Sequence, residues 1–134
     1  MSWQYNQTTG ELRKDGILAG VGYSGFGNGK NNPELQAVHD IGPIPCGWWT
    51  VEGPPRSTDT HGPYVLGLTP DADTNTFGRA DFLIHGDSEE HPGQASKGCI
   101  IAPPQVRTRI WQSGDTRLLV VSGMLAVLDP EIVN

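Results

Sequence analysis

The sequence predicts a mostly β domain of the α+β class, in which short mixed strands alternate with tight turns and one or two short helices. Three observations indicate this class. There are 18 glycines and 11 prolines among 134 residues, which suits a chain that turns often. Segments rich in aromatic and β-branched residues recur between the turns. A single stretch near residue 105 combines helical periodicity with a proline start.

The length and composition predict one domain over residues 1–134. An apolar content of 36% is enough for one core and leaves little for a second. The chain shows no internal repeat and no low-complexity linker. We therefore expect every functional residue to lie in one folded unit.

The expected elements follow the pattern of apolar runs and turn residues. The Asp15-Gly16 dipeptide favours a hairpin turn, and Gly114 ends the helix, whose apolar face holds Val106 and Ile110. The predicted strands are 3–5, 12–14, 17–23, 48–51, 64–68, 82–85 and 118–121, with a rigid turn at 42–47, a helix from 103 to 112 and one more edge segment at 124–128.

Residues 24–33, SGFGNGKNNP, predict a long loop because they have no periodicity. Its glycines suggest a phosphate-binding loop, but the spacing excludes that interpretation. Lys30 is followed by Asn31 rather than Ser or Thr, and Ser24 stands where such a loop begins with glycine. A surface loop is the better interpretation.

The charge pattern argues against nucleic acid and membrane partners. The formal net charge is −6, the sequence pI is about 5.0, and lysine and arginine do not cluster. The N-terminus lacks a basic and apolar leader, and no apolar run approaches the roughly 20 residues that a spanning helix needs. We expect a protein that is made in the bacterial cytoplasm without a cleaved signal and does not insert into membranes.

The stretch HGDSEEHPGQASKGC, residues 85–99, carries the chemistry. A predicted buried strand delivers His85 to its end and bends at Gly86, while Cys99 follows a flexible turn at Gly98. A base, a nucleophile and backbone N–H groups for an oxyanion hole are thus candidates on two neighbouring segments.

The residue types alone leave three interpretations open. The first is a cysteine nucleophile activated by histidine. The second is a metal site with ligands His85, Asp87, His91 and Cys99. The third is structural: Cys99 is a buried apolar side chain, or it forms a disulfide with Cys46.

The strings FLIHGD and SKGCII resemble the active-site segment of L,D-transpeptidases, and PIPCGWWTV resembles a strand of that family. A closer resemblance, through GYSGFGNGKNNPELQ, HGP and FGR in the same order, is to the L,D-transpeptidase-like effectors that bacteria inject through type VI secretion. It implies an L,D-transpeptidase-like β-sandwich and covers nearly the whole chain.

The resemblance also implies roles for individual residues. Cys99 would be the nucleophile and His85 the general base, with the Gly86 carbonyl orienting the imidazole. The N–H groups of Gly98 and Cys99 would form the oxyanion hole, and Ser96 would shape the turn. Both cysteines would then be free thiols, because a disulfide would silence the nucleophile.

Two positions depart from the wider family's pattern. Lys97 replaces its second histidine, and Ile101 replaces an arginine that would bind the substrate carboxylate. We assign that binding role to Arg79 or Arg107, with a solvated surface cation as the alternative for each. Asp87 would tune His85 or hold a substrate amine, or it would only cap a turn.

His39, His61 and Cys46 lie in turn-like sequence and receive no role, and His91 is expected to be exposed to solvent.

The resemblance implies a peptidoglycan stem peptide as substrate and no cofactor. The enzyme would act as an L,D-carboxypeptidase, or exchange D-amino acids through a Cys99 thioester, in the target-cell periplasm. Its other partners would be a cognate immunity protein and a component of the secretion apparatus. The alternatives are a zinc-dependent peptidase using His85, Asp87 and Cys99, and a non-catalytic wall-binding module.

Overall fold

A computed structural model describes residues 2–123, and its elements are short, as the turn-rich composition predicts. No helix among these residues is long and apolar enough to span a membrane. The strands are β1 (Trp3–Asn6), β2 (Glu11–Lys14), β3 (Ile17–Val21), β4 (Tyr23–Ser24), β5 (Gly47–Thr58), β6 (Gly62–Pro70), β7 (Leu83–His85), β8 (Ile100–Ile101) and β9 (Arg117–Val121). The helices are the 3-10 turns η1 (Gly27–Gly29) and η2 (Pro33–Leu35) and the α-helix α1 (Pro104–Gln112).

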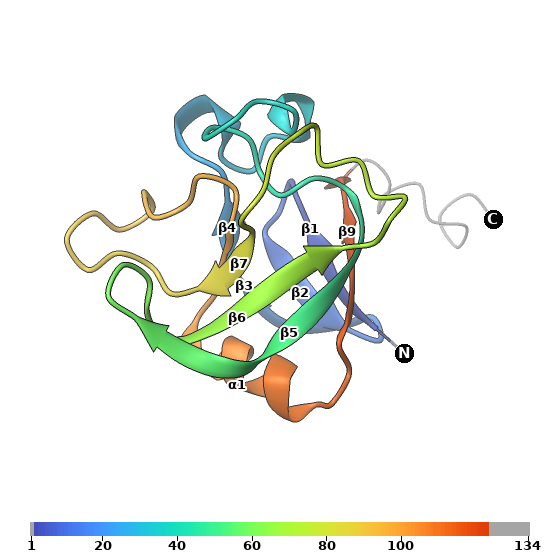
Figure 1. Ribbon diagram of the computed structural model, residues 1–134, viewed down its shortest axis with the longest axis vertical. Coiled ribbons are helices and arrows are strands. Elements are labelled where there is room, and N and C mark those ends of the chain that lie inside the picture. Colours follow the sequence, from blue (N-terminus) through green and yellow to red (C-terminus); the bar gives the residue numbers. More distant parts are fainter. Residues whose placement is uncertain (1, 124–134) are drawn as a thin grey trace.

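The strands are hydrogen-bonded into one mixed sheet in the order β3-β2-β1-β9-β5-β6-β7-β8-β4. The pairs β1·β9 and β7·β8 are parallel, and the others are antiparallel. Only Gly22 separates β3 from β4, the two outer strands, so the sheet bends until its edges meet there (Figure 1). The mostly β class with one α-helix is confirmed, and the strands form a single mixed sheet; the β-sandwich that the resemblance implied stays a prediction.

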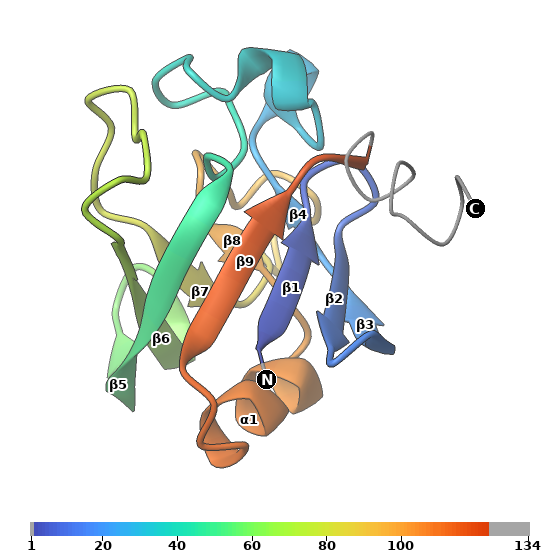
Figure 2. The same cartoon turned by 90° about the vertical axis from the view of Figure 1, so that its right-hand side faces the viewer.

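The core lies inside the curve of the sheet, and α1 lies across one end of it (Figure 2). The helix begins at two prolines, whose fixed φ suits a first helical turn, and Val106 and Ile110 enter the core. This confirms the predicted helix. The largest fully buried apolar side chains are those of Trp3, Tyr5, Leu12, Ile44, Trp49, Leu66, Ile84, Ile100, Ile110 and Leu118.

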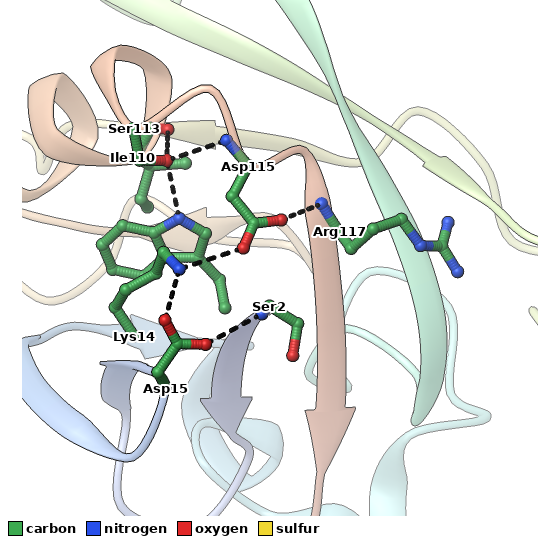
Figure 3. A network of polar contacts seen from close by, with 8 residues as sticks. Ser2, Lys14, Asp15, Ile110, Ser113, Asp115 and Arg117 are labelled. Carbon is green, nitrogen blue, oxygen red and sulfur yellow. Dashed lines mark hydrogen bonds and ion pairs between the residues drawn. The ribbon is translucent and has the colours of Figure 1, made fainter.

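A polar network ties the N-terminal strands to the connection between α1 and β9 (Figure 3). Lys14 Nζ forms ion pairs with Asp15 at 2.6 Å and with Asp115 at 3.1 Å, and the indole of Trp3 donates to Ser113 Oγ at 3.1 Å. β1 and β2 are thereby tied to the connection between α1 and β9, at the end of the sheet that α1 covers.

The hairpin of β5 and β6 is longer than the sequence predicted. The predicted strand ended at Val51, yet β5 continues to Thr58. The register shifts between Glu52 and Arg56, so Pro54 and Pro55 lie in an irregularity of the ladder and break no regular pairing. This extension carries the turn that follows Thr58 toward the 86–99 loop (Figure 1). The edge segment predicted at 124–128 lies outside the described residues.

Candidate active site

Parallel pairing of β7 with β8 brings His85 and Cys99 together. Ile84 is opposite Ile100, so the same register sets Cys99 beside Leu83, two residues before His85. Both isoleucines point into the core, and side chains alternate along a strand. His85 and Cys99 therefore share the other face of the sheet. Both line one open cavity of about 1460 Å³, together with His61, Arg56, Lys97 and Arg107.

His85 is held as a neutral base. Its side chain is 3% exposed, and Nδ1 lies 2.8 Å from the carbonyl oxygen of Gly86. A carbonyl can only accept, so Nδ1 carries the proton and Nε2 is the free basic nitrogen. Burial lowers the pKa of His85 from its ordinary value, opposed by the Gly86 bond and assisted by the nearby His61 and Arg107. The contact with the Gly86 carbonyl thus fixes the orientation of the imidazole.

The Cys99 thiol is protonated at rest. Burial raises its pKa to about 11, and this outweighs a hydrogen bond from the Leu83 backbone and the charge of Arg79, which both lower it. At pH 7 roughly one molecule in 10⁴ carries the thiolate. The pair therefore begins as thiol and neutral imidazole, and the chemistry it supports is general-base removal of the proton during attack.

Ser96 organises the turn that presents Cys99, as predicted. Its buried hydroxyl donates to the Cys99 carbonyl at 2.6 Å and accepts from the Gly98 N–H at 3.1 Å. It also accepts from the Gly25 N–H at 2.9 Å. One hydroxyl thus fixes both ends of the turn and joins it to a distant segment.

The glycine-rich stretch at 24–33 is a support for this turn, a role that the sequence did not reveal. Ser24 Oγ donates to the Gly98 carbonyl at 3.1 Å and accepts from the Ile44 N–H at 2.8 Å. Asn31 lies across the stretch, and its N–H donates to the Ser24 carbonyl at 2.9 Å. A loop expected to lie free on the surface is instead tied into the site.

Arg79 differs from its predicted role as a ligand for a substrate carboxylate. The side chain is 6% exposed, and its two terminal nitrogens donate to four protein carbonyls, so its terminal N–H groups are not available to substrate. Gly98 has φ +139°, and a Cβ there would overlap with Arg79 Nη2. Arg79 therefore holds the nucleophile turn in place, by its hydrogen bond to the Lys97 carbonyl and its packing against Gly98. Its acceptors are the carbonyls of Gln36, Gly42, Pro43 and Lys97.

Arg107 supports the base in a comparable way, and it also lines the cavity. It is 4% exposed; Nε donates to the Ala102 carbonyl at 3.0 Å, and Nη1 donates to Pro63 and Tyr64. Nη2 packs against Gly86, where a Cβ would lie 2.9 Å from it. Since Arg107 also lines the cavity, Nη2 is a candidate donor to a substrate anion.

The two backbone N–H groups predicted for an oxyanion hole are not equivalent. The Gly98 N–H donates to Ser96 Oγ inside the turn, so it is engaged by the protein. The Gly98 carbonyl accepts from Ser24, and in a trans peptide the next N–H points the opposite way. The Cys99 N–H therefore points away from the support and is the better oxyanion donor.

Asp87 caps the 86–95 loop. It accepts from the Tyr23 hydroxyl at 2.6 Å and from the backbone N–H groups of Ser88 and Gly93. Burial opposes its ionisation, but these hydrogen bonds lower its pKa below the ordinary value. Of the alternatives considered for Asp87, turn capping is the one that its contacts support.

The proposed metal ligands do not come together. Within residues 2–123, no group of three or more His, Cys, Asp or Glu side chains is arranged to hold a metal ion. The zinc-peptidase alternative on His85, Asp87 and Cys99 therefore lacks a site. Cys46 and Cys99 are both free, and the Cys46 thiol donates to Gln7 Oε1 at 3.1 Å.

His61 is the cavity residue that sequence reasoning missed. It follows β5 in the hairpin turn, and its ring centroid lies 4.5 Å from that of His85. The two histidines are 24 positions apart, so no local spacing pairs them. Only the HGP string in which His61 stands could have drawn attention to it.

Comparison with known families gives one match. The Tlde1 domain model matches residues 19–124, which include part of β3, all of β4 to β9, the cavity residues named above and both supporting arginines. No curated protein and no solved structure matches the chain.

Proposed function

Because the chain belongs to the Tlde1 domain family, which is related to type VI secretion effectors, we propose that it is a cysteine enzyme that modifies peptidoglycan stem peptides. The observation that carries this proposal is the placement of Cys99 and an oriented, neutral His85 on one face of the β7–β8 pair, beside an open cavity. The substrate is a tetrapeptide stem, cleaved at the L,D bond before its terminal D-alanine.

The reaction begins with attack of Cys99 Sγ on the carbonyl carbon of the third stem residue. His85 Nε2 takes the thiol proton as the C–S bond forms, and the Gly86 carbonyl, bonded to Nδ1, stabilises the resulting imidazolium. The Cys99 N–H donates to the oxyanion. Collapse of the tetrahedral intermediate breaks the C–N bond, and His85 returns the proton to the departing D-alanine amine.

The thioester then passes to an acceptor. Attack by water, deprotonated by His85, releases a tripeptide, which is L,D-carboxypeptidase activity; attack by a D-amino acid amine gives exchange. Arg107 would bind the terminal carboxylate of the stem, because it lines the cavity and the terminal nitrogens of Arg79 are engaged by protein carbonyls. Arg56 and Lys97 bring further positive charge to the cavity.

The biological setting of this proposal is antibacterial. An effector that acts on the wall would be delivered by a secretion-apparatus component and would be active in the target-cell periplasm. The producing cell has the same wall chemistry, so it would need a cognate immunity protein. The non-catalytic wall-binding module is the remaining alternative, and turnover or a covalent acyl adduct on Cys99 would exclude it.

The test is to incubate the purified protein with tetrapeptide muropeptides and to analyse the products by mass spectrometry. We expect loss of D-alanine with the wild type and none with Cys99→Ala. The chain supplies a matched control, because Cys46 is also a free, partly buried cysteine but does not line the cavity. Cys46→Ala should keep activity; equal turnover by wild type and Cys99→Ala would overturn the proposal.

A further inference from the structure

A second histidine lies against the proposed base. The ring of His61 contacts that of His85, with centroids 4.5 Å apart and planes inclined by 54°. Both rings line the cavity that contains Cys99. The residues come from different elements, the turn between β5 and β6 and the end of β7, so the contact is made by the tertiary fold.

The hairpin turn holds His61 in place from two sides. Its backbone N–H donates to Thr58 Oγ1 at 2.8 Å, and its Nδ1 lies 3.0 Å from Thr60 Oγ1. Gly62 follows at φ +79°, a left-handed conformation that glycine adopts without strain and that lets the chain enter β6 at once. The ring is therefore fixed by its own turn and does not depend on His85 for its orientation.

Three neighbours act on the charge of His85. Arg107 from α1 and His61 from the hairpin both oppose its protonation, and Asp87 from the 86–95 loop favours it. If both contacting rings carried an extra proton, two like charges would lie side by side, and their repulsion opposes the second proton.

We propose that His61 is a positioning residue, which packs against the imidazole of His85 and restricts the pair to one proton. This deepens the proposed function and rests on it, because His85 must be neutral to take the Cys99 proton. The restriction keeps the base available as the solution becomes more acidic. His61 also supplies a second histidine to the site, although Lys97 stands at the sequence position where the wider family has one.

The test separates packing from charge with two variants. His61→Phe keeps a ring and removes the charge; we expect kcat at neutral pH within about 3-fold of wild type and an acid limb of the kcat/KM profile moved to higher pH. His61→Ala removes both, so the same shift should accompany a loss of about 10-fold in kcat. His39→Phe, whose ring does not line the cavity, is the matched control and should move neither quantity.

A readout independent of turnover keeps this proposal distinct from the proposed function. The pKa of His85, measured by NMR titration of its ring C–H signals, should be higher in His61→Phe than in wild type. If the His85 pKa rises in His61→Phe but the wild-type protein does not cleave muropeptides, the role of His61 is supported and the proposed enzymatic function is contradicted. A His85 pKa that is unchanged or lower in both His61 variants would overturn the role of His61.

Discussion

The nucleophile turn (Ser96–Cys99) and the base segment (His85–Gly86) share one feature but are held in position in different ways. Each contains a glycine packed against the Nη2 of a buried arginine, Gly98 against Arg79 and Gly86 against Arg107. The base segment ends a strand that is paired on both sides, by β6 and by β8. The turn precedes a two-residue strand and is held mainly by the side chains of Ser24 and Arg79 from distant segments and by its own Ser96.

This difference indicates which substitutions should disturb the geometry of the site most. Backbone pairing holds His85, and the Ala102 N–H adds a further bond to its carbonyl at 3.0 Å. The three carbonyls of Lys97, Gly98 and Cys99 each depend on one side chain, from Arg79, Ser24 and Ser96 respectively. Substitutions that remove those side chains should displace the nucleophile, whereas equivalent changes near the base should leave it in position.

The largest effect is expected from the arginines. Arg79→Met leaves four carbonyls without their donors and should lower the free energy of unfolding by at least about 4 kcal/mol. Arg107→Met leaves three and should cost less. Urea unfolding of both variants measures the difference, and equal losses would contradict the asymmetry.

The two glycines give the next comparison. Gly98→Ala places a Cβ against Arg79 at φ +139° and should cost about 2 to 4 kcal/mol of stability, with a large loss of kcat. Gly86 has no left-handed φ, and the end of the Arg107 side chain can shift, so Gly86→Ala should cost about 1 kcal/mol. Thermal unfolding and steady-state kinetics of each variant measure the two losses. A larger loss of stability or of kcat in Gly86→Ala than in Gly98→Ala would contradict the expected order.

Ser96→Ala should have an intermediate effect. It removes a buried hydroxyl that makes three hydrogen bonds and should cost about 1 to 3 kcal/mol. Its kcat should fall while KM changes little, because the nucleophile moves and the cavity does not. Ser88→Ala, in the 86–95 loop, removes one exposed hydrogen bond and is the control. Similar kcat values for the two variants would argue against the role of Ser96.

The smallest effect is on the pH dependence of stability. The folded-state pKa of His85 is lowered by burial, so between the ordinary value of 6.5 and that lower pKa the unfolded chain binds the extra proton. Stability should therefore fall as the pH drops below about 6.5 and level off beneath the folded pKa. Comparing the wild type with His85→Gln by urea unfolding at pH 5 and pH 7.5 isolates this contribution, and an equal pH dependence in both would contradict it.

Local features of the chain were predictable from sequence, and long-range ones were not. The helix from Pro104, the strand ending at His85 and the turn before Cys99 follow from proline, glycine and apolar spacing. Nothing local distinguishes Arg79 as buried, because its acceptors at 36–43 are about 40 positions away. His61 was missed for the same reason, since the fold alone brings it to His85.

The central claim is that Cys99, and not Cys46, forms the covalent intermediate. Mass spectrometry of the intact protein, quenched in acid soon after mixing with a tetrapeptide stem, tests it directly. We predict an adduct of the tripeptide acyl group that maps to Cys99 after digestion, is absent from Cys99→Ala and persists in Cys46→Ala. Turnover without any adduct on Cys99, or an adduct on Cys46, would contradict the mechanism.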